Sequence, residues 1–439
     1  MVQVRITNAD KSALFQEQQT LQFGNSNSTD STITIHEDSV YQKIDGFGFA
    51  LTGGSAQLMM QMAPDKRKEL IDELFRSDKN NIGISYLRVS VGASDMNDHV
   101  FSYDDLADGQ TDASLAHFDL ADDRKDVVPV LQEILKVNPK IKILASPWSA
   151  PVWMKTNNNV RGGKLKKEYY PVYAQYFLKY IGQMKKEGIV IDAITIQNEP
   201  MNGKNTPSMQ MFPDEQLDFV KNYLGPAFKT AGAKTKVILF DHNCDSADYP
   251  ISILNDPEAA KYADGSAFHL YNGKITAMSK VHNSHSDKNL YFTEQMVTER
   301  GGFTPGKYVA RLVIGAPRNW SRNVLLWNLA ADINNKPHTS NGGCPFCQGA
   351  ITIDSGKLTS RNIAYYVIAH ASKYVRPGSV RIGSDNLRSL PNVAFKTPGN
   401  KRVLIVANTS ASAQHFNIAW NGKMVSAVLN SGAAATYVW

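Results

Sequence analysis

Residues 191–200 read Ile-Asp-Ala-Ile-Thr-Ile-Gln-Asn-Glu-Pro, a short apolar run that ends directly in polar side chains. Its length and its β-branched residues predict a buried strand. Apolar residues recur at helical spacing over 173–184 before it and over 217–228 after it. This stretch therefore predicts one strand of a parallel sheet, with a helix on either side of it in the chain.

The same strand and helix unit recurs through the middle of the chain. Seven further strands are predicted at 44–51, 84–91, 141–145, 236–240, 265–271, 289–293 and 323–327. Eight such units predict an α/β fold in which the sheet closes into a (β/α)8 barrel, the TIM barrel. A doubly wound open sheet is the alternative, but no Gly-x-Gly-x-x-Gly opens a helix after the first strand, which disfavours its nucleotide-binding form.

Both ends of the chain have a different pattern. Residues 379–439 contain short strand-like runs, polar turns and no helical period, and Asn421-Gly422 is a hairpin signal. Near the N-terminus, 20–23 and 32–35 are strand-like, with a turn-forming stretch at 25–30 between them. We expect the two ends to form one antiparallel β-sandwich beside the barrel. The predicted division is 40–376 for the barrel and 1–39 plus 377–439 for the sandwich.

Composition excludes several classes of function. The 439 residues are 42% hydrophobic with a net charge of +6, and no basic block interleaves with aromatic residues, so nucleic acid is disfavoured as a partner. No apolar stretch is long enough to span a membrane. The first 25 residues lack an apolar signal region. We expect a secreted, periplasmic or cell-surface protein whose export signal is absent from this sequence, with a cytoplasmic location as the alternative.

Three cysteines are too few for a disulfide scaffold. Cys344 and Cys347 have the spacing of half a zinc site, but no second such pair accompanies them. A local disulfide that staples a loop and two inert thiols both remain open.

Two glutamates follow strands of the predicted barrel at once. Glu199 comes after the fourth strand and Glu294 after the seventh, on opposite sides of an eight-strand ring. Reactive groups of barrel enzymes lie at the carboxyl ends of the strands. Glycosidic bond cleavage needs two carboxyl groups, one protonated to assist the leaving oxygen and one ionised. The pair therefore predicts a glycosidase, and we expect the charge of Glu294 to raise the pKa of Glu199.

Further stretches carry a resemblance to a family. They are Gly46-Phe-Gly-Phe-Ala50, Tyr86-Leu-Arg-Val-Ser-Val91, Leu144-Ala-Ser-Pro-Trp-Ser-Ala-Pro-Val-Trp153, Thr195-Ile-Gln-Asn-Glu-Pro200, Phe268-His-Leu-Tyr271, Phe292-Thr-Glu294 and Trp327-Asn328. With them, the chain resembles glycoside hydrolase family 30, whose side-by-side β-sandwich matches the one expected here.

The resemblance implies roles for individual residues. Glu199 corresponds to the general acid/base and Glu294 to the nucleophile of a retaining mechanism. Asn198 corresponds to a residue that binds the sugar 2-hydroxyl, and Arg88 to one that keeps Glu294 ionised. The other substrate-binding residues that we expect are Asp95, Trp148, Tyr271, Trp327, His269 and Asn328, although His269 also fits a buried core histidine. No metal and no cofactor is expected.

The substrate is inferred from later stretches. Residues 323–332, 342–352 and 361–373 are most similar to the β-1,6-glucanases of the family, which implies a pustulan-like β-1,6-glucan as the partner. Glucosylceramidase, β-glucosidase and β-xylosidase activities are alternatives, and a non-catalytic carbohydrate-binding protein is a remote one. Endo or exo action and the oligomeric state are left open.

Overall fold

The barrel forms as the sequence predicts. The structure is a computed structural model that describes residues 1–25 and 28–439, so Ser26 and Asn27 of the expected turn lie outside the described residues. Eight parallel strands close in the order β10-β11-β4-β5-β6-β7-β8-β9. They are β4 (Gly46–Ala50), β5 (Tyr86–Ser90), β6 (Lys142–Ser146), β7 (Ala193–Thr195), β8 (Lys236–Cys244), β9 (Ala263–Gly273), β10 (Asn289–Glu294) and β11 (Ser321–Leu326).

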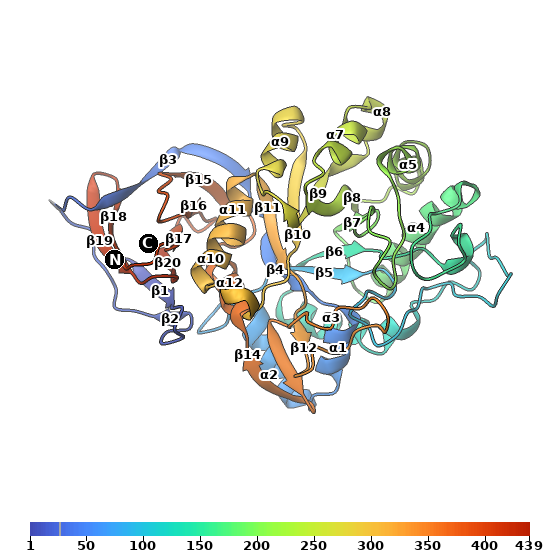
Figure 1. The fold of residues 1–439 in the computed structure, drawn as a ribbon, viewed down its shortest axis with the longest axis horizontal. Coiled ribbons are helices and arrows are strands. Elements are labelled where there is room, and N and C mark those ends of the chain that lie inside the picture. Colours follow the sequence, from blue (N-terminus) through green and yellow to red (C-terminus); the bar gives the residue numbers. More distant parts are fainter. Residues whose placement is uncertain (26–27) are drawn as a thin grey trace.

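Helices surround the barrel (Figure 1). They are α1 (Gly53–Met60), α2 (Pro64–Phe75), α3 (Val127–Val137), α4 (Tyr170–Lys186), α5 (Pro213–Phe219), α6 (Gly225–Thr230), α7 (Asp248–Leu254), α8 (Pro257–Ala260), α9 (Ala277–Ser284), α10 (Pro305–Tyr308), α11 (Gly315–Arg318) and α12 (Ile363–Ser372). One π-helical segment, Val220–Leu224, joins α5 to α6, and another, Val309–Ile314, joins α10 to α11. None of the described helices is long and apolar enough to cross a bilayer.

Side chains fill the barrel. A closed apolar layer contains one residue from each of seven strands: Tyr86, Leu144, Ala193, Ile238, Ala267, Tyr291 and Leu325. Because side chains alternate between the two faces of a strand, residues two positions further along point into the same interior, nearer the carboxyl ends of the strands. That next layer is polar, and it carries the candidate site.

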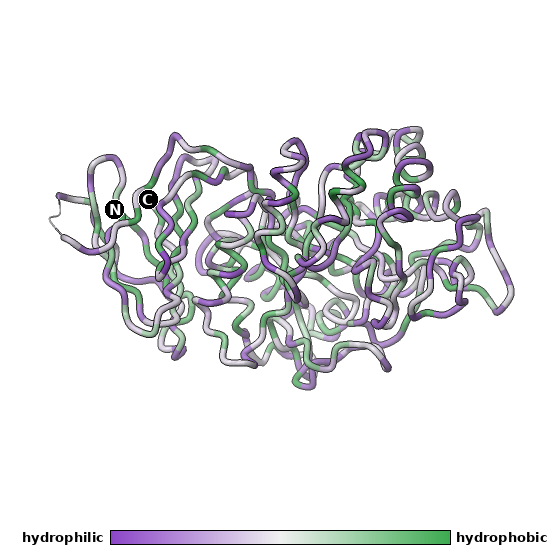
Figure 2. The backbone as a smooth tube through the Cα atoms, turned by 45° about the horizontal axis from the view of Figure 1, so that its top comes forward, coloured by the Kyte–Doolittle hydropathy of each residue, from purple (hydrophilic) through white to green (hydrophobic). Residues whose placement is uncertain are grey.

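The two chain ends form one curled sheet of nine strands beside the barrel, in the order β19-β18-β3-β15-β16-β17-β20-β1-β2 (Figure 1). The strands are β1 (Gln3–Thr7), β2 (Gln16–Glu17), β3 (Ser31–Lys43), β15 (Val380–Ser384), β16 (Asn392–Lys396), β17 (Arg402–Ala407), β18 (Gln414–Trp420), β19 (Lys423–Leu429) and β20 (Ala434–Val438). This confirms the expected sandwich unit. In Figure 2 the tips of the protruding loops and helices are mostly hydrophilic.

Two details of this unit differ from the prediction. The sheet is mixed, because β18 pairs with β3 in parallel. These strands lie far apart in the chain, and no tight hairpin forces them to run in opposite directions. At the N-terminus, 20–23 forms only an isolated bridge at Leu21, and the strand is β1, which pairs with β20. The division of the chain at residues 40 and 376 stays a prediction.

A small third sheet lies after the barrel's last strand. It contains β12 (Ala330–Ala331), β13 (Ile351–Asp354) and β14 (Lys357–Arg361). The loop between β12 and β13 carries a disulfide between Cys344 and Cys347, so of the two alternatives left open by the sequence the structure has the loop staple. Cys347 packs against Trp148 and Trp327, and the disulfide therefore ties a loop that supports the barrel mouth.

Candidate active site

The polar layer at the barrel mouth follows from strand geometry. Arg88, Ser146, Thr195, His269, Thr293 and Trp327 each lie two residues after a member of the apolar layer. On β8 the register shifts between Phe240 and His242, so Asp241 takes the inward position that regular alternation would give to Phe240. Phe240 and Asp241 have φ values of 72° and 70°, a left-handed conformation that these residue types rarely adopt. The bulge thus brings a carboxylate into the layer.

Glu294, at the end of β10, is held at both oxygens. Its Oε2 accepts a hydrogen bond from Nη1 of Arg88 at 2.5 Å, and its Oε1 accepts one from the Tyr271 hydroxyl at 2.9 Å. Burial raises the pKa of Glu294, while the positive charges of His269 and Arg88 act in the opposite direction. A carboxylate fixed at both oxygens is oriented before any substrate arrives.

Glu199 lies just beyond β7 and is strained. Its φ is 45°, and its backbone N–H donates to the carbonyl of Asp241 at 2.9 Å, which ties the turn to β8. Its side-chain Oε2 accepts from Nδ2 of Asn202 at 2.7 Å, and its Oε1 faces Nδ1 of His269 at 3.2 Å. The side chain is only 8% exposed, so these few contacts determine its charge.

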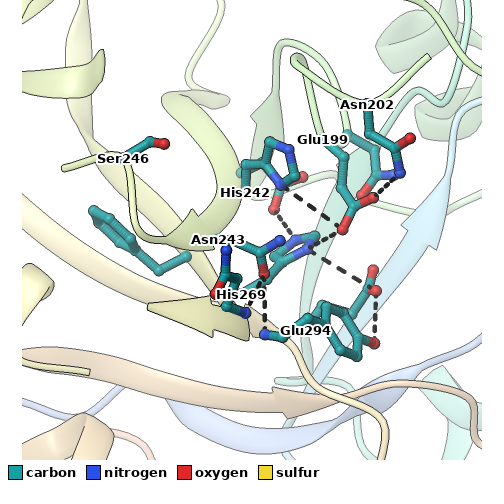
Figure 3. A network of polar contacts seen from close by, with 12 residues as sticks. Glu199, Asn202, His242, Asn243, Ser246, His269 and Glu294 are labelled. Atoms are coloured by element: carbon teal, nitrogen blue, oxygen red, sulfur yellow. Dashed lines mark hydrogen bonds and ion pairs between the residues drawn. The ribbon is translucent and has the colours of Figure 1, made fainter. Parts of the chain in front are cut away.

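His269 lies between the two glutamates (Figure 3). Its Nδ1 is 3.2 Å from Oε1 of Glu199 and 3.9 Å from Oε1 of Glu294. The sum of these distances, 7.1 Å, is an upper limit on the separation of the two carboxylate oxygens. Carboxyl groups about 5–5.5 Å apart are typical of retaining glycosidases, and inverting enzymes need about 6.5–9.5 Å. The limit excludes most of the inverting range.

Asp241 connects these groups from below. It is fully buried, and its carboxylate accepts hydrogen bonds from Arg88 at 2.8 Å and His269 at 3.0 Å. The hydroxyls of Thr195 and Thr293 donate to it at 2.6 Å each. Burial alone would raise the pKa of Asp241, but Arg88 and His269 hold it far below its usual range. Asp241 is therefore a fixed negative charge beneath the site.

The charges around His269 reverse one expectation. Burial disfavours its imidazolium, but Glu294, Asp241 and Glu199 raise the pKa of His269 to about 9. Burial would also raise the pKa of Glu199, yet the hydrogen bond and charge of His269 lower it to about 2. The expected upward shift for Glu199 is thus wrong for the ligand-free protein. One proton serves both groups and rests on His269.

Aromatic rings form one wall. Trp148 and Trp327 pack with ring centroids 5.5 Å apart, and the guanidinium carbon of Arg88 lies 4.8 Å from the Trp148 ring centroid. Asp95 is buried after β5, and burial followed by the charges of Glu294 and Glu199 raises its pKa to about 8. At neutral pH the Asp95 carboxyl is therefore mostly protonated and is able to donate a hydrogen bond.

The structure thus brings together most of the expected site residues. Asn198 accepts a hydrogen bond from Arg88 at 2.7 Å, beside Glu294. Asn328 differs: its Oδ1 accepts from the hydroxyls of Thr52 and Ser55 at the start of α1. Among the described residues its contacts do not join it to either glutamate. Its role in binding a sugar stays a prediction.

Three members of the site were not expected from the sequence. Asp241 and His242 directly follow the run 236–240, so the rule of inspecting each strand end would have found them. Asn202 belongs to the turn that begins at Glu199, and its contact is a tertiary detail. His242 lies 3.8 Å from Glu199, and burial lowers the pKa of this histidine.

The fold and site define a class: a barrel enzyme with paired acidic groups at the carboxyl ends of its strands. The TIM-barrel domain of glycosyl hydrolase family 30 matches residues 44–375, and the β-sandwich domain of the same family matches 378–437. The chain belongs to glycoside hydrolase family 30, and it is a glycoside hydrolase.

Individual relatives agree with this family. An endo-1,6-β-D-glucanase of Trichoderma harzianum is 33% identical over 414 residues, which cover 87% of this chain and 82% of that protein. A solved endo-β-1,6-glucanase is 32% identical, with a TM-score of 0.92, over 100% of this chain and 99% of the other. The lysosomal acid glucosylceramidase of Mus musculus is 28% identical over 88% of this chain and 79% of its own length.

Proposed function

We propose that the protein hydrolyses β-1,6-glucan with retention of anomeric configuration. The observation that carries this proposal is the placement of Glu199 and Glu294 on either side of His269, within 7.1 Å of each other. That spacing leaves room for one sugar carbon between the carboxyl groups and favours direct attack over a water held between them. The similarity to two endo-β-1,6-glucanases supports the choice of linkage.

In the proposed reaction Glu294 attacks the anomeric carbon and forms a covalent glycosyl intermediate. Arg88 and Tyr271 orient its oxygens for this attack. Glu199 gives a proton to the leaving oxygen and then removes one from the water that releases the sugar. Because the proton rests on His269 in the free protein, it must pass along the 3.2 Å contact to Glu199 before the bond breaks.

Endo action is part of the proposal. A cavity of about 700 Å³ lies among the loops after β5 and β6, and its lining includes Ala93, Ser149, Ala150 and Trp153. Ala93 is two residues from Asp95, and Ser149 follows Trp148 directly. This cavity would hold glucosyl units beyond the one at the glutamates.

We also propose that the enzyme works outside the cytoplasm. Disulfides persist in oxidising compartments and are rare in the cytosol. The Cys344–Cys347 disulfide supports such a location, as does a polymeric substrate.

The test is a product profile on glucans of defined linkage. The proposal requires rapid cleavage of pustulan to oligosaccharides of intermediate length, with the β-anomer formed first in proton NMR. Slow pustulan cleavage with rapid hydrolysis of glucosylceramide or an aryl β-xyloside would favour an alternative within the family. Formation of the α-anomer first would refute retention.

A further inference from the structure

A second cluster of acidic and imidazole side chains lies outside the site, in the long loop that connects β5 to α3. Asp104, Asp112 and His117 each offer a donor atom, and these atoms all lie within 4.8 Å of one another. Asp104 is 1% exposed and Asp112 is 6% exposed, while the His117 ring reaches solvent. Two buried carboxylates this close repel each other unless a positive charge lies between them.

Local structure explains the position of Asp112. Its carboxylate accepts hydrogen bonds from the His117 backbone N–H at 2.8 Å, from Nδ1 of His117 at 2.9 Å and from the Ser114 hydroxyl at 2.8 Å. These donors hold the pKa of Asp112 well below its usual range, so this residue is ionised. A turn-capping role accounts for these contacts, and Asp112 alone would not indicate a ligand.

Asp104 has no such explanation. Within the described part of the chain, neither of its buried carboxylate oxygens has a hydrogen-bond partner. The nearby ammonium of Lys179 donates instead to the carbonyl of Leu115. Burial and the charge of Asp112 raise the pKa of Asp104 to about 6. A buried carboxylate without a donor is costly, and a bound cation is one of the few ways to satisfy it.

We propose that Asp104, Asp112 and His117 form a binding site for a divalent transition-metal ion of the zinc class. Two carboxylates and an imidazole suit such ions better than Ca²⁺ or Mg²⁺, which prefer oxygen donors alone. Nδ1 of His117 and Oδ2 of Asp112 are 2.9 Å apart. Two donors about 2.1 Å from one ion, at a right angle, would be separated by about 3 Å. The exposed face of His117 gives the ion an entry path and leaves room for water ligands.

The role of the site is structural. It joins residues 104 and 117 of one long loop, and the indole N–H of Trp153 donates to the carbonyl of Asp104 at 3.0 Å. Residues 100–102 and 105–111 of the same loop line the 700 Å³ cavity beside the barrel mouth. A bound ion would fix one wall of that cavity. This inference does not depend on the proposed substrate.

The same loop offers a matched control. His99 also contacts two aspartates, through Nδ1 to Asp98 and Nε2 to Asp122. Because opposite ring nitrogens make these contacts, one ion could not touch all three side chains.

The experiment is calorimetric titration of Zn²⁺ into the full chain after removal of metal with a chelator. We expect one site that weakens at least tenfold in Asp112→Asn and His117→Gln and is unchanged in His99→Gln. Zinc held by the catalytic group Glu199, His242 and His269 would survive the first two substitutions. Absence of zinc binding, its survival in both variants, or tighter binding of Ca²⁺ would overturn the proposal.

Melting temperatures of Asp104→Asn give a second measurement. Without metal, this variant should melt at or above the wild-type temperature, because it removes a buried charge that Asp112 repels. Zn²⁺ in hundredfold excess over its Kd should raise the melting temperature of the wild type but not of the variant. Equal zinc-induced shifts in both proteins would contradict the assignment of Asp104.

Discussion

Nδ1 of His269 lies 3.2 Å from Oε1 of Glu199, while Nε2 of the same ring contacts Asp241 at 3.0 Å. The Glu199–His269 pair therefore titrates as one unit, with pKa values of about 2 and about 9. Between these values the pair holds a single proton. This proton is the one that the proposed general acid must deliver.

The first prediction concerns the alkaline limb of the pH profile. In the wild type, kcat/KM should fall as pH rises through about 9, because the pair then loses its proton. In His269→Asn the proton is held by Glu199 alone, and the limb should move down by about one pH unit or more. His282→Asn, a substitution in α9, is the control and should keep the wild-type profile. An unchanged limb in His269→Asn would show that the ring does not share the catalytic proton.

The second prediction concerns Glu199→Ala. Without its general acid the enzyme should lose activity on pustulan, but an aryl glucoside with a good leaving group should still form the covalent intermediate. Azide should then restore turnover and give a β-glucosyl azide, measured by NMR. Rescue should be absent in the wild type. Failure of rescue in a folded variant would contradict the acid/base role of Glu199.

The third prediction concerns the nucleophile. Glu294→Gln keeps the size of the side chain but removes its negative charge, so kcat should fall by about 10⁴-fold or more. Steady-state assays on pustulan measure this change. The matched control is Glu299→Gln, whose carboxylate makes a surface ion pair with Lys11 and should retain full activity. A loss of less than tenfold in Glu294→Gln would end the assignment.

The fourth prediction concerns Tyr271→Phe. The hydroxyl of Tyr271 donates to Oε1 of Glu294 at 2.9 Å, so its loss leaves one oxygen of the nucleophile free to rotate. We expect kcat to fall by about 10- to 100-fold, the effect of losing one hydrogen bond to a charged group. Circular dichroism should show an unchanged fold. Tyr223→Phe, on the outer helices, serves as the control, and equal kinetics in both variants would argue against a positioning role.

The fifth prediction concerns stability. Arg88 is fully buried and bonds both Glu294 and Asp241, so Arg88→Met leaves two buried carboxylates without their cation. The free energy of unfolding, measured with urea, should fall by about 3–5 kcal/mol. The surface variant Arg76→Met should unfold like the wild type. Adding Asp241→Asn to Arg88→Met should recover part of the loss, because one uncompensated charge disappears. No recovery would place the effect in packing.

Much of the fold could be predicted from the sequence because its signals are local. Each barrel strand is a short apolar run followed by polar residues, and all eight predicted runs fall on the observed strands. The missed strand β1 also carries a signal, since Val2, Val4 and Ile6 alternate with polar residues. Its partner β20 lies at the far end of the chain, and sequence pattern does not indicate such distant pairings.

The sequence by itself determined the barrel, the addition of a β unit from both chain ends, and the placement of Glu199 and Glu294 at strand ends four and seven. These follow from side-chain periodicity and from the rule that parallel strands end at one face. Only the tertiary structure decided where the catalytic proton rests. The bulge on β8 brings Asp241 beneath His269, and the charge of one buried group depends on all its neighbours in space. Asp104 shows the same limit, because only the folded loop reveals that its buried carboxylate has no donor.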